Sequence, residues 1–290
     1  MSLLSTKTFL CVVINLIVCQ YTQSLYIEHE NSSNATFPAV NNNDSGRIVG
    51  GHNAELGDFP YVAMVHLLVG NGTIRRSGAC GGTVLSRRWV LTAGHCVVDW
   101  PQRFFVVFGI VDKSRIRYNF LQDPVVSMIT NQTFIHPQYS MHYNDIALLY
   151  MPQNIPFSKA IQPIKFAWYY DESFAKRDAQ VISWRKDNTD GKDTIKLKYA
   201  TVPIIKNNVC KQSWSISDQH ICTTTGLGQD ACEGVSGGGP LIVKINGRAY
   251  QIGIVSYGDQ DCPSKGPYVF TKVSSYIDWI HEVMMQRYSA

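Results

Sequence analysis

The chain has 290 residues, of which 45% are hydrophobic and 17% charged, and its formal net charge is +4. A chain of this size and composition can bury a large core, as one sizeable domain or two small ones. The positive charge is mild and spread along the sequence, which shows no repeats or low-complexity stretches. These features argue against a nucleic-acid partner and against a repetitive matrix or coat protein.

The N-terminus has the pattern of a secretory signal. Lys7 precedes an apolar run over residues 9–19, and small or polar residues continue to Ser24. The run has about half of the ~20 residues that a membrane span needs, which argues against an anchor. We therefore predict a signal peptide over residues 1–24, a secreted, extracellular protein and no membrane association.

Cysteine and asparagine patterns fit an oxidising, secretory environment. Cys11 and Cys19 lie in the signal, and the six remaining cysteines form an even set that predicts three disulfides, with fifteen connectivities open. These six are Cys80, Cys96, Cys210, Cys222, Cys232 and Cys262. Acceptor sites for N-glycosylation occur at Asn31, Asn34, Asn43, Asn71 and Asn131.

After the signal, residues 25–47 are polar and rich in asparagine, and we interpret them as a disordered pro-segment. From residue 48 to about 272, short β-branched or aromatic runs alternate with Gly, Pro and Asn, which predicts an all-β barrel or sandwich. The end differs, because apolar residues at 277, 280, 283 and 284 recur at helical intervals. We expect a closing helix there, capped by Ser274 or Ser275.

Four motifs with chemical potential follow one another in the sequence. His95 stands beside a cysteine in residues 91–96, and Asp145 opens the apolar run at 146–149. Ser236 lies in a glycine-rich loop over residues 232–241, and Ser-Tyr-Gly follows at 256–258. Together with the Ile-Val-Gly-Gly start at residue 48, these motifs resemble the trypsin/chymotrypsin-like serine proteases over residues 48–290.

This resemblance implies two packed six-stranded antiparallel β-barrels with a C-terminal α-helix and a cleft between the barrels. It selects one cysteine pairing: Cys80–Cys96, Cys210–Cys222 and Cys232–Cys262. It also implies cleavage between Arg47 and Ile48, which would release the pro-segment.

The resemblance further assigns roles in catalysis. His95 matches the general base, Asp145 the residue that orients it, and Ser236 the nucleophile. Gly234 matches the oxyanion-hole glycine, whose N–H stabilises the developing alkoxide. Asp230 matches the acid at the floor of an Arg/Lys-selective pocket, and Ser256, Gly258 and Tyr268 match positions of its wall.

The nucleophile loop departs from the family pattern, which reads Cys-x-Gly-Asp-Ser-Gly-Gly-Pro-Leu. Val235 replaces the aspartate that pairs with the new N-terminus, and one extra glycine precedes Pro240. A gap placed after Ser236 leaves Val235 and Ser236 in the two key positions. A gap placed before it puts Ser236 in the aspartate position and Gly237 in the nucleophile position. Glu233 is the one acid in the loop that could replace the aspartate.

Two further departures affect the pocket. Tyr268 replaces a glycine and should fill much of the pocket, unless a shifted loop turns its ring outward. The sequence Ser183-Trp184-Arg185 stands where the family has Gly-Trp-Gly. Because these changes weaken the pocket and the oxyanion hole together, we expect a catalytically impaired or inactive homologue that binds or regulates another protein.

The alternative is an active secreted endopeptidase with Arg/Lys preference and a His-Asp-Ser triad. We expect no cofactor and no metal, a protein as substrate or partner, and a monomer. Because residues 25–47 contain no cysteine, we expect a homologue of the insect type that lacks an accessory disulfide-knot module.

Overall fold

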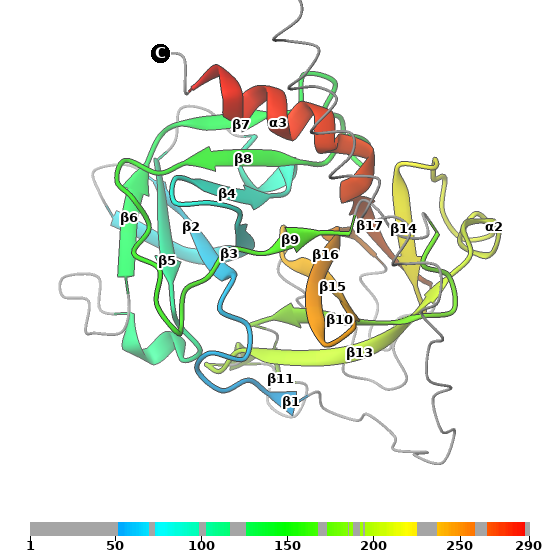
Figure 1. Ribbon diagram of the computed structural model, residues 1–290, viewed down its shortest axis with the longest axis horizontal. Helices are drawn as coiled ribbons and strands as arrows, with labels where there is room; N and C mark the ends of the chain where they lie inside the picture. Colours follow the sequence, from blue (N-terminus) through cyan, green and yellow to red (C-terminus); the bar gives the residue numbers. More distant parts are fainter. Residues whose placement is uncertain are drawn as a thin grey trace, which may run out of the picture. The chain divides into compact units, whose positions relative to one another are not determined.

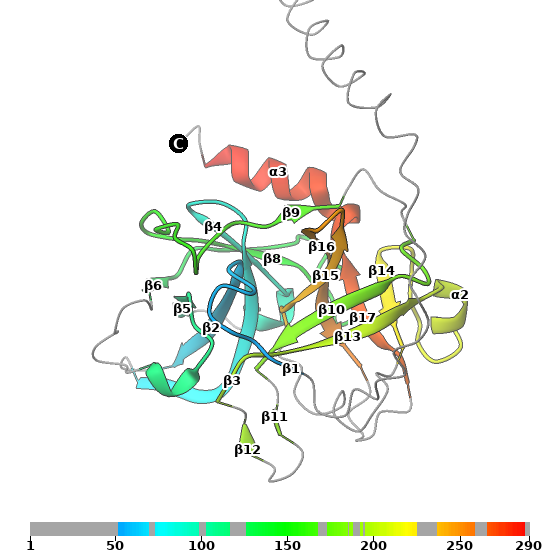
Figure 2. The same ribbon diagram turned by 60° about the horizontal axis from the view of Figure 1, so that its bottom comes forward.

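The short β-branched and aromatic runs form the strands of two sheets in the computed structural model (Figures 1 and 2). All of the strands that the structure describes belong to one unit, Arg47–Ala290. The structure describes residues 52–69, 73–98, 103–116, 126–167, 173–184, 186–187, 192–193, 195–224, 237–258 and 266–287. Among the described helices, none is long and apolar enough to cross a membrane.

The first sheet has the strand order β6-β5-β2-β3-β4-β8-β7, with antiparallel pairings throughout. Its strands are β2 (Val62–Val69), β3 (Thr73–Val84), β4 (Trp89–Thr92), β5 (Arg103–Phe108), β6 (Val126–Thr130), β7 (Thr133–Ile135) and β8 (Ala147–Tyr150). The two edge strands, β6 and β7, are separated only by Asn131 and Gln132, and the N–H of Tyr150 donates to the Gln132 carbonyl at 3.0 Å. Counted as one bent strand, β6 and β7 reduce the seven strands to the six expected.

The second sheet has the order β1-β13-β10-β15-β16-β17-β14. Its strands are β1 (His52–Asn53), β10 (Asp178–Ser183), β13 (Lys198–Ile205), β14 (His220–Thr223), β15 (Pro240–Ile245), β16 (Arg248–Tyr257) and β17 (Tyr268–Lys272). A further antiparallel pairing between β13 and β14 closes six of these strands into a barrel. β9 (Lys165–Phe166) joins the sheet through a parallel pairing with β16.

The remaining elements are short. They are β11 (Lys186–Asp187), β12 (Lys192–Asp193), the 3-10 helices η1 (Gly94–Cys96), η2 (Lys113–Arg115) and η4 (Val273–Tyr276), and the α-helices α2 (Asn207–Cys210) and α3 (Ile277–Gln286). The predicted closing helix is α3, but its predicted caps are wrong. Ser274 and Ser275 lie inside η4, and Tyr276 is the N-cap of α3 without a side-chain hydrogen bond. Both serines belong to the 3-10 turn because this turn begins directly after β17 ends at Lys272.

Apolar side chains from both halves meet in shared core clusters. One cluster joins Tyr61 and Met64 of the first half to Ile182, Trp184 and Ile242 of the second. In another, the buried face of α3 packs with residues of β4 and β8, so the C-terminal helix covers the first sheet (Figure 1). Burial on this scale stabilises a domain by roughly 25 cal/mol per Å² of apolar surface. The expected all-β fold with a C-terminal helix is confirmed; of the two expected six-stranded barrels, the second sheet forms a closed six-stranded barrel and the first sheet a half-barrel.

Candidate active site

His95 and Asp145, both carried by the first half of the molecule, form an intact acid–base pair. His95 lies in η1, directly after β4, and the Cys80–Cys96 disulfide ties this turn to β3. Its ring Nδ1–H donates to Oδ2 of Asp145 at 2.8 Å, and its backbone N–H donates to Oδ1 at 2.9 Å. Both bonds fix the ring and leave Nε2 as the nitrogen that can accept a proton.

Asp145 is buried, with 3% of its surface exposed. Burial raises the pKa of its carboxyl, but hydrogen bonds from His95 and Ser256 and the charge of His95 outweigh burial, so the pKa lies below its usual value. The Ser256 hydroxyl donates to Oδ2 at 2.5 Å. The carboxylate is therefore ionised at neutral pH and holds the imidazole in the tautomer that a general base needs. Ser256 was expected in the pocket wall; in the structure its hydroxyl stabilises the Asp145 carboxylate by a hydrogen bond.

Two further residues hold the segment that carries the acid. The Thr271 hydroxyl donates to the Asp145 carbonyl at 2.9 Å, and the Tyr276 hydroxyl donates to Oδ1 of Asn144 at 3.1 Å. Each contact joins positions more than a hundred residues apart in the chain. No local motif marks Thr271 or Tyr276 as site residues, which is why sequence reasoning missed them.

The described part of the glycine loop places Gly237 opposite the base. The Gly81 N–H donates to the Gly237 carbonyl at 2.8 Å, and the Gly238 N–H donates to the Val255 carbonyl at 2.9 Å. Gly238 has φ +79°, a left-handed conformation that glycine adopts without steric cost. A Cβ added to Gly237 would lie 2.0 Å from Nε2 of His95. Among the described residues of the loop, Gly237 is therefore the one that faces the base, and this is the residue that the alignment with the gap before Ser236 puts in the nucleophile position.

Tyr268 lies in the wall of the expected pocket and is 9% exposed. A Cβ added to Gly258 would stand 2.5 Å from Cδ1 of the Tyr268 ring, so the ring packs directly against the glycine backbone. Tyr268 also belongs to the core cluster that contains Val255 and Phe270. Its ring therefore points into the second half of the molecule and packs on Gly258.

Close to the acid–base pair, the ring of His142 stacks on the ring of Tyr257. His142 has φ +76°, and its ring stands 4.2 Å from that of Tyr257, at an interplanar angle of 37°. Trp214 packs edge-on against the same ring at 5.4 Å. The Tyr257 hydroxyl is buried without a hydrogen-bond partner among the described residues, and burial raises its pKa to about 12. Sequence reasoning missed His142 and Trp214, because only the fold brings them to Tyr257.

Several other expected features can be located. The disulfides Cys80–Cys96 and Cys210–Cys222 are present, and Asn131 is exposed between β6 and β7. Ser183 and Trp184 are buried at the end of β10. The following expected site residues lie outside the described part of the chain: Arg47, Ile48, Asp230, Cys232, Gly234, Ser236, Cys262, Asn31, Asn34, Asn43 and Asn71. Val235, Glu233 and Arg185 lie outside it as well.

One group of metal-ligand atoms in the described residues comprises Cys80, His95 and Cys96, whose atoms lie within 4.8 Å of one another. Both sulfurs are consumed in the disulfide between these cysteines. A disulfide sulfur is not the thiolate that binds metals, so this group is not a metal site.

Comparisons with known proteins agree with the architecture. A family model described as Trypsin matches residues 48–280. The chain is 30% identical over 256 residues to CLIP domain-containing serine protease B4 of Anopheles gambiae, covering 81% of this chain and 70% of that protein. It is 34% identical over 241 residues to the Venom protease of Bombus pensylvanicus, covering 80% of this chain and 96% of that protein. Among solved structures, one named HL collagenase matches with a TM-score of 0.67 and 27% identity, covering 82% of this chain and 98% of that one.

Proposed function

Because the chain belongs to the trypsin family of serine proteases, we propose that it is a non-catalytic, secreted homologue that acts by binding another protein. The observation that carries this proposal is that Gly237, among the described residues of the loop, faces the base. Nε2 of His95 stands so close to Gly237 that a Cβ there would be 2.0 Å away. A base without a hydroxyl to deprotonate cannot generate the attacking alkoxide.

The same distance limits what a simple substitution could restore. A base and a nucleophile need about 2.6–3.2 Å between the heavy atoms that share the proton. A serine at position 237 would bring its Cβ well inside that distance, so the ring of His95 would have to move away. The loop is therefore adapted to the glycine and is more than a triad with one hydroxyl deleted.

Tyr268 supports the proposal independently. Its buried ring packs on Gly258, so it takes up space that a substrate side chain would enter. A trypsin-type pocket selects Arg or Lys by charge and hydrogen bonds at its floor, and this requires open space above the floor. In this proposal, the protein has no nucleophile and also no space for the substrate side chain.

The alternative function is an active endopeptidase with Arg/Lys preference. The contacts of His95, Asp145 and Ser256 favour it, because they match those of a working general base. This function requires Ser236, which directly precedes Gly237, to bring its hydroxyl to Nε2. It also requires the ring of Tyr268 to leave the pocket.

The proposal includes the expected organisation of the chain. Residues 1–24 would be removed as a signal peptide, and residues 25–47 would form a pro-segment that detaches after cleavage at Arg47. Residues 48–290 would act as a monomer without cofactor or metal. Asn131, which is exposed, would be accessible to a glycan.

Labelling with a serine-directed fluorophosphonate probe tests the proposal. The zymogen is expressed in secreted form, cut after Arg47, confirmed by N-terminal sequencing, and incubated with the probe beside trypsin as a positive control. We expect no covalent label on the cleaved protein and none on Ser236→Ala. Stoichiometric labelling that disappears in Ser236→Ala, but persists in a Ser213→Ala control, would establish the active alternative.

A further inference from the structure

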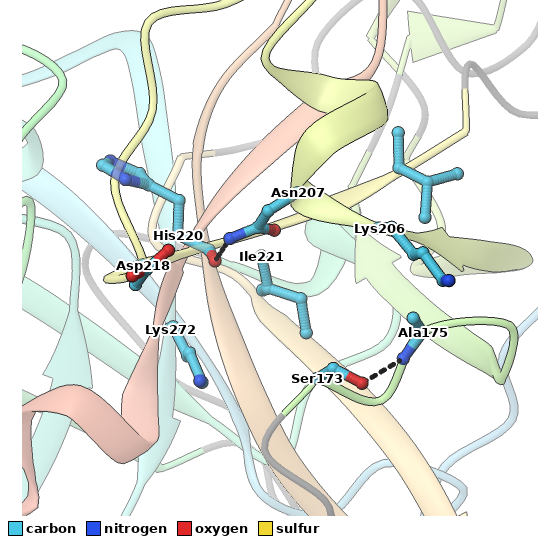
Figure 3. Close-up of a pocket in the computed structure, with 9 residues that line it drawn as sticks. Ser173, Ala175, Lys206, Asn207, Asp218, His220, Ile221 and Lys272 are labelled. Carbon is cyan, nitrogen blue, oxygen red and sulfur yellow. Dashed lines mark hydrogen bonds between the residues drawn. The ribbon is translucent and has the colours of Figure 1, made fainter.

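A hollow in the second half of the molecule lies where β13, α2, β14 and β17 meet the loop before β10. Its volume is about 360 Å³, and none of its lining residues belongs to the acid–base pair or the pocket wall. Ala175, Ile205 and Ile221 supply apolar surface, while Lys206 and Lys272 supply charge. In Figure 3 the amino groups of the two lysines lie on opposite sides of Ile221.

The charges that line the hollow leave a positive balance. Among the described residues, neither Lys206 nor Lys272 has a carboxylate within 4.0 Å of its ammonium group. His220 also lines the hollow, but its Nδ1 accepts the Ser217 N–H at 3.0 Å and its Nε2–H donates to the His142 carbonyl at 2.7 Å. This ring is therefore bonded as a neutral imidazole. Asp218 is the one acid in the lining, against two lysines.

The walls of the hollow are fixed before any ligand arrives. The Cys210–Cys222 disulfide ties α2 to β14. Nδ2 of Asn207 donates to the His220 carbonyl at 3.2 Å, and the Lys176 N–H donates to the Ile204 carbonyl at 2.8 Å. Because the backbone is already held, binding costs little conformational entropy beyond that of the lysine side chains.

A second hollow of about 610 Å³ continues from the first, and the two share Asp218 and Lys272. Ser274, Ser275, Asp278 and His281 line this extension, and the added carboxylate of Asp278 confines the positive balance to the first hollow. A ligand that crosses Lys272 would therefore meet hydroxyl groups, a carboxylate and an imidazole next. An extended chain of several residues fits such an arrangement better than a single compact ion.

From these features we infer that the hollow binds a short acidic segment of a partner protein. An apolar side chain of the segment packs on Ala175 and Ile205, and flanking carboxylates bind Lys206 and Lys272. Asp218 accepts a backbone N–H of the segment. The apolar floor favours a peptide over a sulfated sugar, whose surface is polar throughout. This inference rests on the proposed protein-binding role and gives that role a surface and a partner chemistry.

Fluorescence anisotropy with a labelled peptide, acetyl-Glu-Glu-Leu-Glu-Glu-amide, tests the inference. We expect saturable binding that weakens about fivefold in Lys206→Gln and in Lys272→Gln, as for the loss of one exposed ion pair. The matched control is Lys244→Gln, which removes an exposed lysine of β15 outside the hollow and should leave binding unchanged. Replacing the central Leu of the peptide by Gly should weaken binding, because the apolar floor then loses its contact.

A second variant guards against ambiguity. Ala175→Glu places a carboxylate in the lining and should weaken peptide binding by at least about tenfold, while circular dichroism checks that the fold is kept. Equal losses of peptide binding in all three lysine variants would overturn the inference by showing non-specific attraction.

A sulfated disaccharide serves as the probe for a glycan site. If it binds, loses affinity in Lys206→Gln and Lys272→Gln, and the peptide does not bind, the inference is overturned in favour of a glycan site. Each result is independent of fluorophosphonate labelling, so failure here is distinct from failure of the non-catalytic proposal.

Discussion

Two regions of the candidate active site differ in how closely they match the protease pattern: the surroundings of Asp145 match it, and those of Gly237 and Tyr268 depart from it. On the base side, Asp145 receives hydrogen bonds from the backbone and ring of His95 and from Ser256. On the opposite side, Gly237 faces the base and the ring of Tyr268 packs on Gly258. The partners of Asp145 come from both halves of the molecule, so these contacts also hold the halves together. A nucleophile contributes to chemistry alone, and its loss leaves the fold intact.

The largest expected effect comes from repairing the opposite side completely. Deleting Gly237 moves Ser236 one position toward Pro240, Val235→Asp supplies the acid for the new N-terminus, and Tyr268→Gly opens the pocket. We expect the triple variant, cut after Arg47, to hydrolyse Arg-peptide substrates at least about a thousandfold faster than the native chain, since triad members act as a unit. Initial rates with a fluorogenic Arg substrate measure this.

The partial repairs serve as controls for that experiment. The loop repair without Tyr268→Gly, and Tyr268→Gly without the loop repair, should each remain close to the native rate. Adding His95→Ala to the full repair should abolish the gained activity. If the loop repair alone restored Arg-specific cleavage, the pocket would be open and Tyr268 would not obstruct it.

A second prediction addresses the structural importance of the base side. Asp145→Ala leaves the His95 N–H and the Ser256 hydroxyl without their acceptor in a buried place. We expect a loss of about 3 kcal/mol in the free energy of unfolding, measured by urea denaturation. Asp178→Ala, which removes an exposed carboxylate, should change stability by less than about 0.5 kcal/mol. Similar small losses in both variants would contradict a structural role for Asp145.

A third prediction concerns the contact between Gly237 and His95. Gly237→Ala inserts a methyl group where the His95 ring already lies, and we expect a destabilisation of about 2 kcal/mol from overpacking. In a double-mutant cycle, His95→Ala should remove most of that cost, because it vacates the space. Additive losses would indicate that position 237 does not face the ring.

A fourth prediction tests occlusion of the pocket by Tyr268. Benzamidine should bind the native chain more weakly than about 1 mM in calorimetric titrations, the level near −4 kcal/mol. Tyr268→Gly should strengthen binding by about tenfold, and adding Asp230→Asn should cancel the gain. Tyr268→Ala provides a second variant if the glycine variant folds poorly. Tight binding by the native chain would show that Tyr268 does not fill the pocket, and the nucleophile loop would then be the remaining cause of inactivity.

The smallest effect is a pH dependence of stability from Asp145. Because the pKa of Asp145 is lowered in the folded protein from the ordinary value of 3.8, its contribution is present above about pH 4. The contribution disappears as the pH falls through the lowered folded-state pKa. As the pH is lowered through this range, the free energy of unfolding should therefore fall less in Asp145→Asn than in the native chain. Urea titrations at a series of pH values measure this difference. A steeper loss in the variant would contradict the lowered pKa.

Much of the fold could be predicted because its signals are local. The nearly continuous apolar runs in β2 and β5, the His-Cys pair at 95–96 and the Asp before β8 are short patterns, and their order along the chain indicates one family. The resemblance also implied the Cys80–Cys96 and Cys210–Cys222 pairs, which the structure contains. The caps of α3 could not be predicted, because a 3-10 turn competes for the same serines.

By itself, the sequence determined the architecture, the acid–base pair and the fact that the nucleophile loop has one residue too many. It left two positions for the extra residue and two directions for Tyr268. The contacts that bear on these alternatives are tertiary: the hydrogen bonds of Gly237 and Gly238 to segments more than ten residues away, and the packing of the Tyr268 ring on Gly258. A loop of three consecutive glycines has no side chains to set its register, so partners distant in the chain must set it.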